Sequence, residues 1–87
     1  MTKYENLLLR VLSGAADASI AFHDLCALLR WLDFEERVRG SHHIFTRLDI
    51  DEILNLQPKG AQAKPYQVKQ VRQVIVKYRL GGQSGAE

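Results

Sequence analysis

The chain has few of the residues that staple or anchor a fold. Its 87 residues include a single cysteine, Cys26, which excludes an intrachain disulfide framework. Uninterrupted apolar runs span only a few residues, far fewer than the roughly 20 that cross a bilayer. The first residues lack the basic, apolar and small-residue order of a signal peptide. We therefore expect one small cytoplasmic domain over residues 1–80, with no membrane contact.

Acidic residues are missing from the whole segment between Ile53 and Leu80. The basic side chains of this segment are Lys59, Lys64, Lys69, Arg72, Lys77 and Arg79. The 52 residues before it carry six basic and nine acidic side chains. A distribution polarised in this way suits a polyanion bound on one side of the molecule. A solvated helix face with lysines that serve solubility would give the same pattern.

Apolar residues at helical spacing predict three helices. The first lies within residues 1–14 and is ended by Gly14, glycine being the usual stop of a helix. The second covers residues 22–32, and its apolar stripe is wide enough to be covered on more than one side, with the first helix as the expected cover. The third begins at Pro65, because proline suits the first position of a helix.

Between the second and third helices the apolar period changes to two. Alternation predicts strands over residues 34–39, 42–47 and 52–57. The first two strands are joined by the tight turn Gly40-Ser41. Pro58 ends the third strand, and residues 59–64 are expected to form a loop.

The predicted order is α-α-β-β-β-α, and the fold class is α+β. A three-stranded antiparallel sheet with helices on one face makes a two-layer domain whose other sheet face is open to solvent. The helix within residues 1–14 is additional to this unit, and residues 81–87 are expected to be a flexible tail. We expect a functional site on the open sheet face.

Two adjacent histidines follow the turn. Histidine has an ordinary pKa of about 6.5 and can exchange protons near neutral pH. Successive side chains of a strand point to opposite faces, so His42 and His43 diverge. If Phe45 is the core residue of this strand, His42 faces the open side; if Ile44 is the core residue, the parity inverts. The turn favours His42, because the residue beside a tight turn is accessible on either parity.

A short motif gives the chain a resemblance to a known family. It is the segment from Phe34 to Phe45, followed by a strand, a proline-containing loop and a basic helix. Its specific part is the Gly40-Ser41-His42 turn ahead of an aromatic residue. Over residues 20–80 the chain resembles the HicA family, small toxins of bacterial type II toxin–antitoxin pairs. The resemblance implies an α-β-β-β-α fold similar to double-stranded RNA-binding domains, cleavage of mRNA, and a HicB-type antitoxin as partner.

In that family the catalytic histidine directly follows the Gly-Ser pair, which places it at His42 here. The chain departs from the family in two places. Many members have a proline-valine-histidine segment before the last helix, where this chain has residues 55–60 without a histidine. The shorter members also lack the helix within residues 1–14. The resemblance therefore implies an RNA endonuclease with a single catalytic histidine.

A lone imidazole can act as general base on the 2′-hydroxyl of RNA if other groups stabilise the phosphorane charge. The candidates for contacts with RNA are Ser41, Arg39, Lys59, Lys64, Tyr66, Lys69 and Arg72. We expect no metal and no cofactor, because adjacent strand histidines diverge and Cys26 falls in an apolar helix stripe. A non-catalytic RNA-binding module and a protein-binding domain are the alternatives, and only the nuclease requires His42.

Overall fold

The chain begins with a helix that its own sequence caps at both ends. In the computed structural model, which describes residues 2–81, α1 runs over Lys3–Ser13. The Thr2 hydroxyl accepts the Glu5 N–H at 3.1 Å, and the Glu5 carboxylate accepts the Thr2 N–H at 2.8 Å. This reciprocal pair is a capping box. The helix stops at Gly14, as predicted, in the left-handed conformation at φ 73°.

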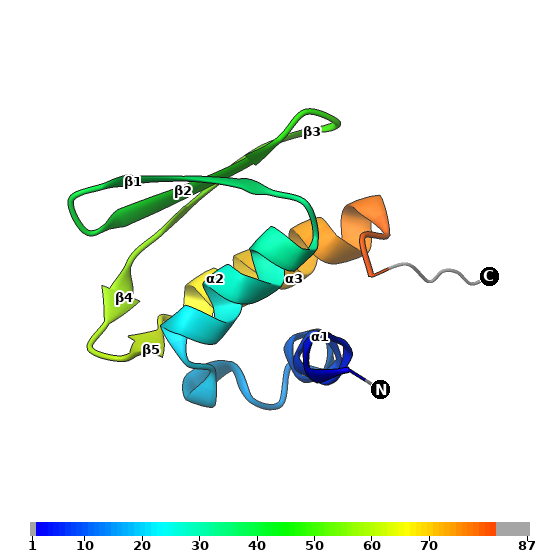
Figure 1. The fold of residues 1–87 in the computed structure, drawn as a ribbon. Coiled ribbons are helices and arrows are strands. Elements are labelled where there is room, and N and C mark those ends of the chain that lie inside the picture. Colours follow the sequence, from blue (N-terminus) through cyan, green and yellow to red (C-terminus); the bar gives the residue numbers. More distant parts are fainter. Residues whose placement is uncertain (1, 82–87) are drawn as a thin grey trace.

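The second helix is covered on two sides. A short 3₁₀ helix, η1 (Asp17–Ser19), leads into α2 (Phe22–Trp31), where Leu25, Leu28 and Leu29 have no exposed surface. Helix α1 packs against both α2 and the last helix, on their side away from the sheet (Figure 1). The prediction that α1 covers α2 is therefore confirmed.

The sheet has three antiparallel strands in the order β1-β2-β3. These are β1 (Glu35–Arg39), β2 (His42–Arg47) and β3 (Ile50–Leu56). Arg39 pairs with His42, so Gly40 and Ser41 form a two-residue turn. Gly40 has φ 61° at the first central position, where a type II′ turn requires glycine. The third strand starts two residues earlier than predicted, because buried Ile50 already pairs with Arg47.

The segment predicted as a loop is instead a small ribbon. Strands β4 (Pro58–Lys59) and β5 (Gln62–Ala63) pair in antiparallel register. Gly60 has φ 61° in the turn between them, the same positive φ that Gly40 has in the turn of the first hairpin. The prediction of a loop over residues 59–64 was wrong, because two strands of two residues leave no apolar alternation to recognise.

The last helix, α3 (Pro65–Tyr78), begins at Pro65 as predicted and packs on β3. Figure 1 shows three layers: the sheet, then α2 with α3, then α1. The expected two layers become three because α1 buries its apolar stripe under the helix pair rather than on the sheet. Within residues 2–81, no helix covers the far face of the sheet (Figure 1).

One continuous core extends from the inner face of the sheet through the helix pair to α1. Its largest fully buried side chains are Phe45, Ile20, Leu25, Leu28, Leu29, Leu56 and Ile75. The α+β class and the order α-β-β-β-α over the last five main elements are as predicted. Over residues 2–81, no helix has both the length and the apolar content needed to cross a bilayer. Of the predicted tail, residues 82–87 lie outside the described residues.

Candidate functional site

The two histidines point to opposite faces of β2. Phe45 has no exposed surface and faces the helices, and half-buried His43 shares its face. His42 is exposed on the open face, in line with the half-buried Ile44. The parity expected from a buried Phe45 is therefore confirmed, and the inverted alternative with Ile44 in the core is excluded.

The His42 ring is oriented by a residue that the sequence did not single out. Its Nδ1 lies 2.9 Å from the Asn55 side-chain oxygen, on the neighbouring strand β3. An amide oxygen only accepts hydrogen bonds, so the contact places the ring proton on Nδ1. In the neutral ring, Nε2 is then left with a free lone pair. This is the form in which an imidazole acts as a base.

Asn55 was missed because only the strand register brings it to His42. Ile44 pairs with Asn55, and His42 lies on the same face of β2 as Ile44, two residues before it. Asn55 is therefore the diagonal neighbour of His42 on the open face. A β-bulge between Phe45 and Arg47 shifts the register of this pair of strands. The alternation within β3 could have shown which face Asn55 occupies, but not which residue of β2 it meets.

Next to this pair, three polar side chains form a chain of hydrogen bonds. The Gln57 amide nitrogen donates to the Ser41 hydroxyl oxygen at 3.0 Å. Lys64 Nζ lies 3.4 Å from the Gln57 amide oxygen. Because the Ser41 oxygen serves as acceptor here, its own proton remains available to a bound ligand. The structure thus brings two predicted contact residues, Ser41 and Lys64, to one place.

A buried glutamine on α3 holds the end of β3. Gln67 is 5% exposed, and its side-chain oxygen accepts the Gln57 N–H at 3.0 Å. Its side-chain nitrogen donates to the Asn55 carbonyl oxygen at 3.3 Å. Gln67 thereby satisfies the backbone carbonyl of Asn55 and the backbone N–H of Gln57. The side chains of these two residues contact His42 and Ser41, respectively. The sequence signal for this role was a polar residue at an apolar position. Gln67 lies four residues before Val71, on the buried stripe of α3.

Arginines border the site on β1. Arg39 is exposed and pairs with His42 across the first hairpin. A shallow hollow extends from there along the open face. It is lined by Glu35, Glu36, Arg37, Arg39, Ile44, Thr46 and Ile53. Its guanidinium groups and apolar centre could accept a phosphate and a base of a nucleic acid.

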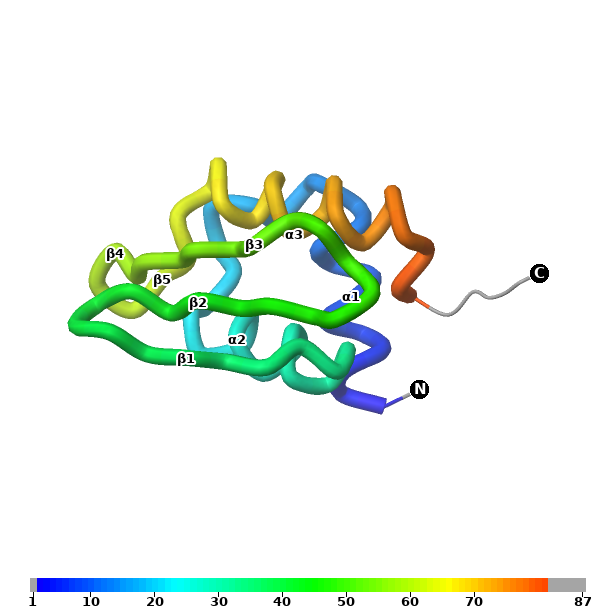
Figure 2. Tube along the Cα trace, turned by 90° about the horizontal axis from the view of Figure 1, so that it is seen from above, coloured from blue at the N-terminus to red at the C-terminus, as the bar shows by residue number. Residues whose placement is uncertain are grey.

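The remaining predicted contact residues are spread along the second half of the chain. Lys59 is exposed on β4, and Tyr66 is 59% exposed in the first turn of α3. Strand β4 and the start of α3 lie toward the same end of the molecule as the turn between β1 and β2 (Figures 1 and 2). Lys69 is exposed further along α3. No contact among the described residues links Lys69 or Tyr66 to His42.

Arg72 has partners elsewhere in the fold. Its guanidinium forms two hydrogen bonds with the Asp17 carboxylate, at 2.8 and 3.1 Å, and one with the Val11 carbonyl oxygen at 3.1 Å. About four-fifths of both charged side chains is buried. The Asp17 contact raises the pKa of Arg72. This arginine joins α3 to the end of α1, so the structure assigns it a structural role and does not bring it to the open sheet face.

We expect Arg72→Gln to lower the free energy of unfolding by about 1–3 kcal/mol, because it leaves a buried carboxylate and a helix-end carbonyl without their partner. Urea denaturation measures the change. The matched control is Lys69→Gln, an exposed position on the same helix, for which we expect a change below about 0.5 kcal/mol. Equal losses in the two variants would contradict this structural role.

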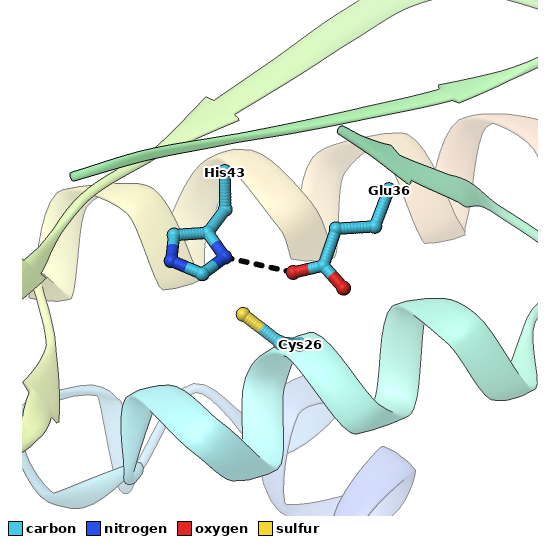
Figure 3. Close-up of side chains that lie close together, drawn as sticks. All are labelled: Cys26, Glu36 and His43. Atoms are coloured by element: carbon cyan, nitrogen blue, oxygen red, sulfur yellow. Dashed lines mark hydrogen bonds and ion pairs between the residues drawn. The ribbon is translucent and has the colours of Figure 1, made fainter. Parts of the chain in front are cut away.

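A second group of polar side chains gathers under the sheet (Figure 3). The Glu36 carboxylate of β1 accepts hydrogen bonds from His43 Nδ1 at 2.7 Å and from the Arg30 guanidinium. Burial works to raise the pKa of Glu36, but the hydrogen bonds from His43 and Arg30 outweigh it and hold this pKa below its ordinary value. Burial, reinforced by the Glu36 charge, raises the pKa of the Cys26 thiol to about 12. Cys26 is buried, as its place in an apolar stripe predicted.

This group contradicts one expectation from the sequence, that the chain cannot assemble a set of metal ligands. One ligand atom each of Cys26, Glu36 and His43 lie within 4.8 Å of one another. The three come from α2, β1 and β2, and their spacing follows no metal-binding motif. The group lies on the helix side of β2, whereas His42 lies on the open side.

Fold and site together define an α+β domain with an exposed, oriented histidine on an open sheet face. No protein-family model matches the sequence, and comparisons with characterised proteins and with solved structures found no match either. A function is therefore to be inferred from the site and the fold.

Proposed function

We propose that this protein is a metal-independent endoribonuclease of the HicA toxin type, with His42 as its catalytic residue. The observation that carries the proposal is the contact between His42 Nδ1 and Asn55, which leaves Nε2 free at an exposed position beside a tight turn. The resemblance of residues 40–45 to HicA toxins supports it. So does the α2-β1-β2-β3-α3 order, which is similar to that of double-stranded RNA-binding domains.

In the proposed reaction, Nε2 of His42 accepts the proton of an RNA 2′-hydroxyl. The 2′-oxygen then bonds to the adjacent phosphorus while the bond from phosphorus to the 5′-oxygen breaks. Water supplies a proton to the departing oxygen, and the hydroxide that remains takes the proton from His42 and restores the base. The products carry a 2′,3′-cyclic phosphate and a 5′-hydroxyl. Arg39 and the Ser41 hydroxyl are placed beside His42 to stabilise the additional negative charge on the phosphoryl oxygens.

The proposed partners are mRNA and a HicB-type antitoxin. Two basic groups at the same end of the molecule, the exposed Lys59 and the half-buried Lys64, suit a phosphate backbone. The hollow on the open face has an apolar part, with Ile53 66% exposed. An antitoxin that covered this face would bury Ile53 and block His42 together.

A second candidate is a non-catalytic RNA-binding module of double-stranded RNA-binding shape. The observation that favours it is the exposed Lys69 on α3, away from His42, since phosphate contacts along a helix need no catalytic group. Binding of RNA without cleavage would distinguish this function from the nuclease.

We expect the purified protein to cleave a long RNA in the presence of EDTA, because the Cys26, Glu36 and His43 group lies on the other side of the sheet from His42. The measurement is the size of the RNA on a denaturing gel, together with circular dichroism to confirm that the chelated protein is folded. Loss of activity in EDTA with recovery in Mg²⁺ would contradict the mechanism. RNA that is bound but stays intact would favour the non-catalytic module.

A further inference from the structure

The group under the sheet offers three different metal-ligating atoms at one point. Cys26 Sγ, a Glu36 carboxylate oxygen and a ring nitrogen of His43 lie within 4.8 Å of one another, and the three side chains point toward one another (Figure 3). In a tetrahedral zinc site, bonds of about 2.0–2.3 Å place the ligand atoms about 3.3–3.7 Å apart. Small side-chain rotations would bring this group to that spacing.

We propose that Cys26, Glu36 and His43 bind one Zn²⁺ ion through a thiolate, a carboxylate oxygen and an imidazole nitrogen. This site is independent of the proposed nuclease function, because it occupies the opposite face of β2 from His42. The mixture of sulfur, nitrogen and oxygen ligands suits a borderline-soft ion such as Zn²⁺ rather than Mg²⁺ or Ca²⁺.

The charges of the group favour a divalent cation. His43 Nδ1 lies 2.7 Å from Glu36 Oε2, and a bound metal ion would take the place of the proton in this hydrogen bond. Arg30 bonds the other carboxylate oxygen, Oε1, and can keep that bond when the metal is bound. Such an outer partner orients a ligating carboxylate. With the thiol deprotonated, the two negative ligands balance the charge of Zn²⁺.

The Cys26 thiol is the group that the metal changes most. Burial and Glu36 keep it protonated in the metal-free protein, so Zn²⁺ binding must release its proton.

The site also has access and room for a fourth ligand. A surface hollow of about 420 Å³ opens onto all three ligands. It is lined by Phe22, His23, Cys26, Arg30, Glu36, His43, Pro58, Gly60 and Ala61. His23 is exposed and lies three residues before Cys26 on α2, which places both on one helix face. Water or the His23 imidazole would complete the tetrahedron.

The test is titration of the full, chelator-treated chain with Co²⁺ under reducing conditions. Cobalt reports the site because a thiolate ligand gives a near-ultraviolet charge-transfer band and a tetrahedral site gives intense visible bands. We expect both bands to saturate at one Co²⁺ per chain and to disappear when Zn²⁺ is added. Zn²⁺ should also raise the thermal midpoint of unfolding.

Two ligand variants and one matched control complete the experiment. Cys26→Ser should lose the charge-transfer band, and both it and His43→Gln should bind Zn²⁺ at least about 100-fold more weakly, beyond the roughly 10–100-fold typical of an outer partner. His42→Gln removes the adjacent histidine from the opposite face and should bind as the wild type does. A wild-type chain without the charge-transfer band would overturn the proposal whether or not the variants fold. Unchanged Zn²⁺ affinity in folded Cys26→Ser would also overturn it.

Discussion

His42→Ala is expected to lower the rate of RNA cleavage by about 10²–10⁴-fold, the usual contribution of a positioned general base. The variant should stay folded, with a free energy of unfolding within about 0.5 kcal/mol of wild type, because the side chain it removes is exposed. Single-turnover cleavage of a labelled RNA and urea denaturation measure the two quantities. Expression of the variant should neither arrest growth nor degrade cellular RNA.

The matched control is the neighbouring histidine. His43→Ala removes a hydrogen-bond partner of Glu36 and an edge-on aromatic contact with Phe22, whose ring centroid lies 4.9 Å from that of His43. We expect a loss of about 1–3 kcal/mol in stability and near-normal cleavage per folded molecule. An inactive His43→Ala protein of normal stability, beside an active His42→Ala protein, would reverse the assignment.

Asn55→Ala is expected to lower the cleavage rate by about 10²-fold, because a misplaced catalytic group costs about this much even when its chemistry is intact. Without the amide oxygen, His42 loses the contact that sets both its ring orientation and its tautomer. Single-turnover rates at saturating RNA separate this effect from RNA binding. Asp51→Ala, at an exposed position of the same strand that lies outside the hollow on the open face, is the matched control and should cleave RNA normally.

Asn55→Asp distinguishes positioning of the ring from a general loss of structure. The carboxylate still accepts the Nδ1–H, so most activity should return at high pH. A carboxylate stabilises the protonated imidazole. As the solution is acidified, the imidazole of this variant should therefore become protonated at a higher pH than in the wild type. The acid limb of the pH–rate profile should move to higher pH. Identical rates and profiles in wild type, Asn55→Ala and Asn55→Asp would show that Asn55 does not position His42.

The placement of the catalytic candidate could be read from local patterns. Helices α1, α2 and α3 follow from apolar spacing with Gly14 and Pro65 as stop and start signals. The side of β2 on which His42 lies follows from alternation around Phe45. These predictions hold because helix and strand periods are short-range properties, which a segment expresses wherever it packs.

The surroundings of that candidate could not be read in this way. Asn55 meets His42 only through the register of β2 and β3, which a bulge shifts. Gln67 reaches the end of β3 from a different element, and Arg72 lies in an ion pair with a residue 55 positions away.

The group of Cys26, Glu36 and His43 shows the same division. The sequence by itself determined that Cys26 lies in the apolar stripe of a helix and that His42 and His43 point to opposite faces of the sheet. Only the tertiary structure decided that both meet Glu36 at one point. The physical reason is that a face is a property of one element and its period, whereas a contact depends on how two elements are placed by the packing of the whole core.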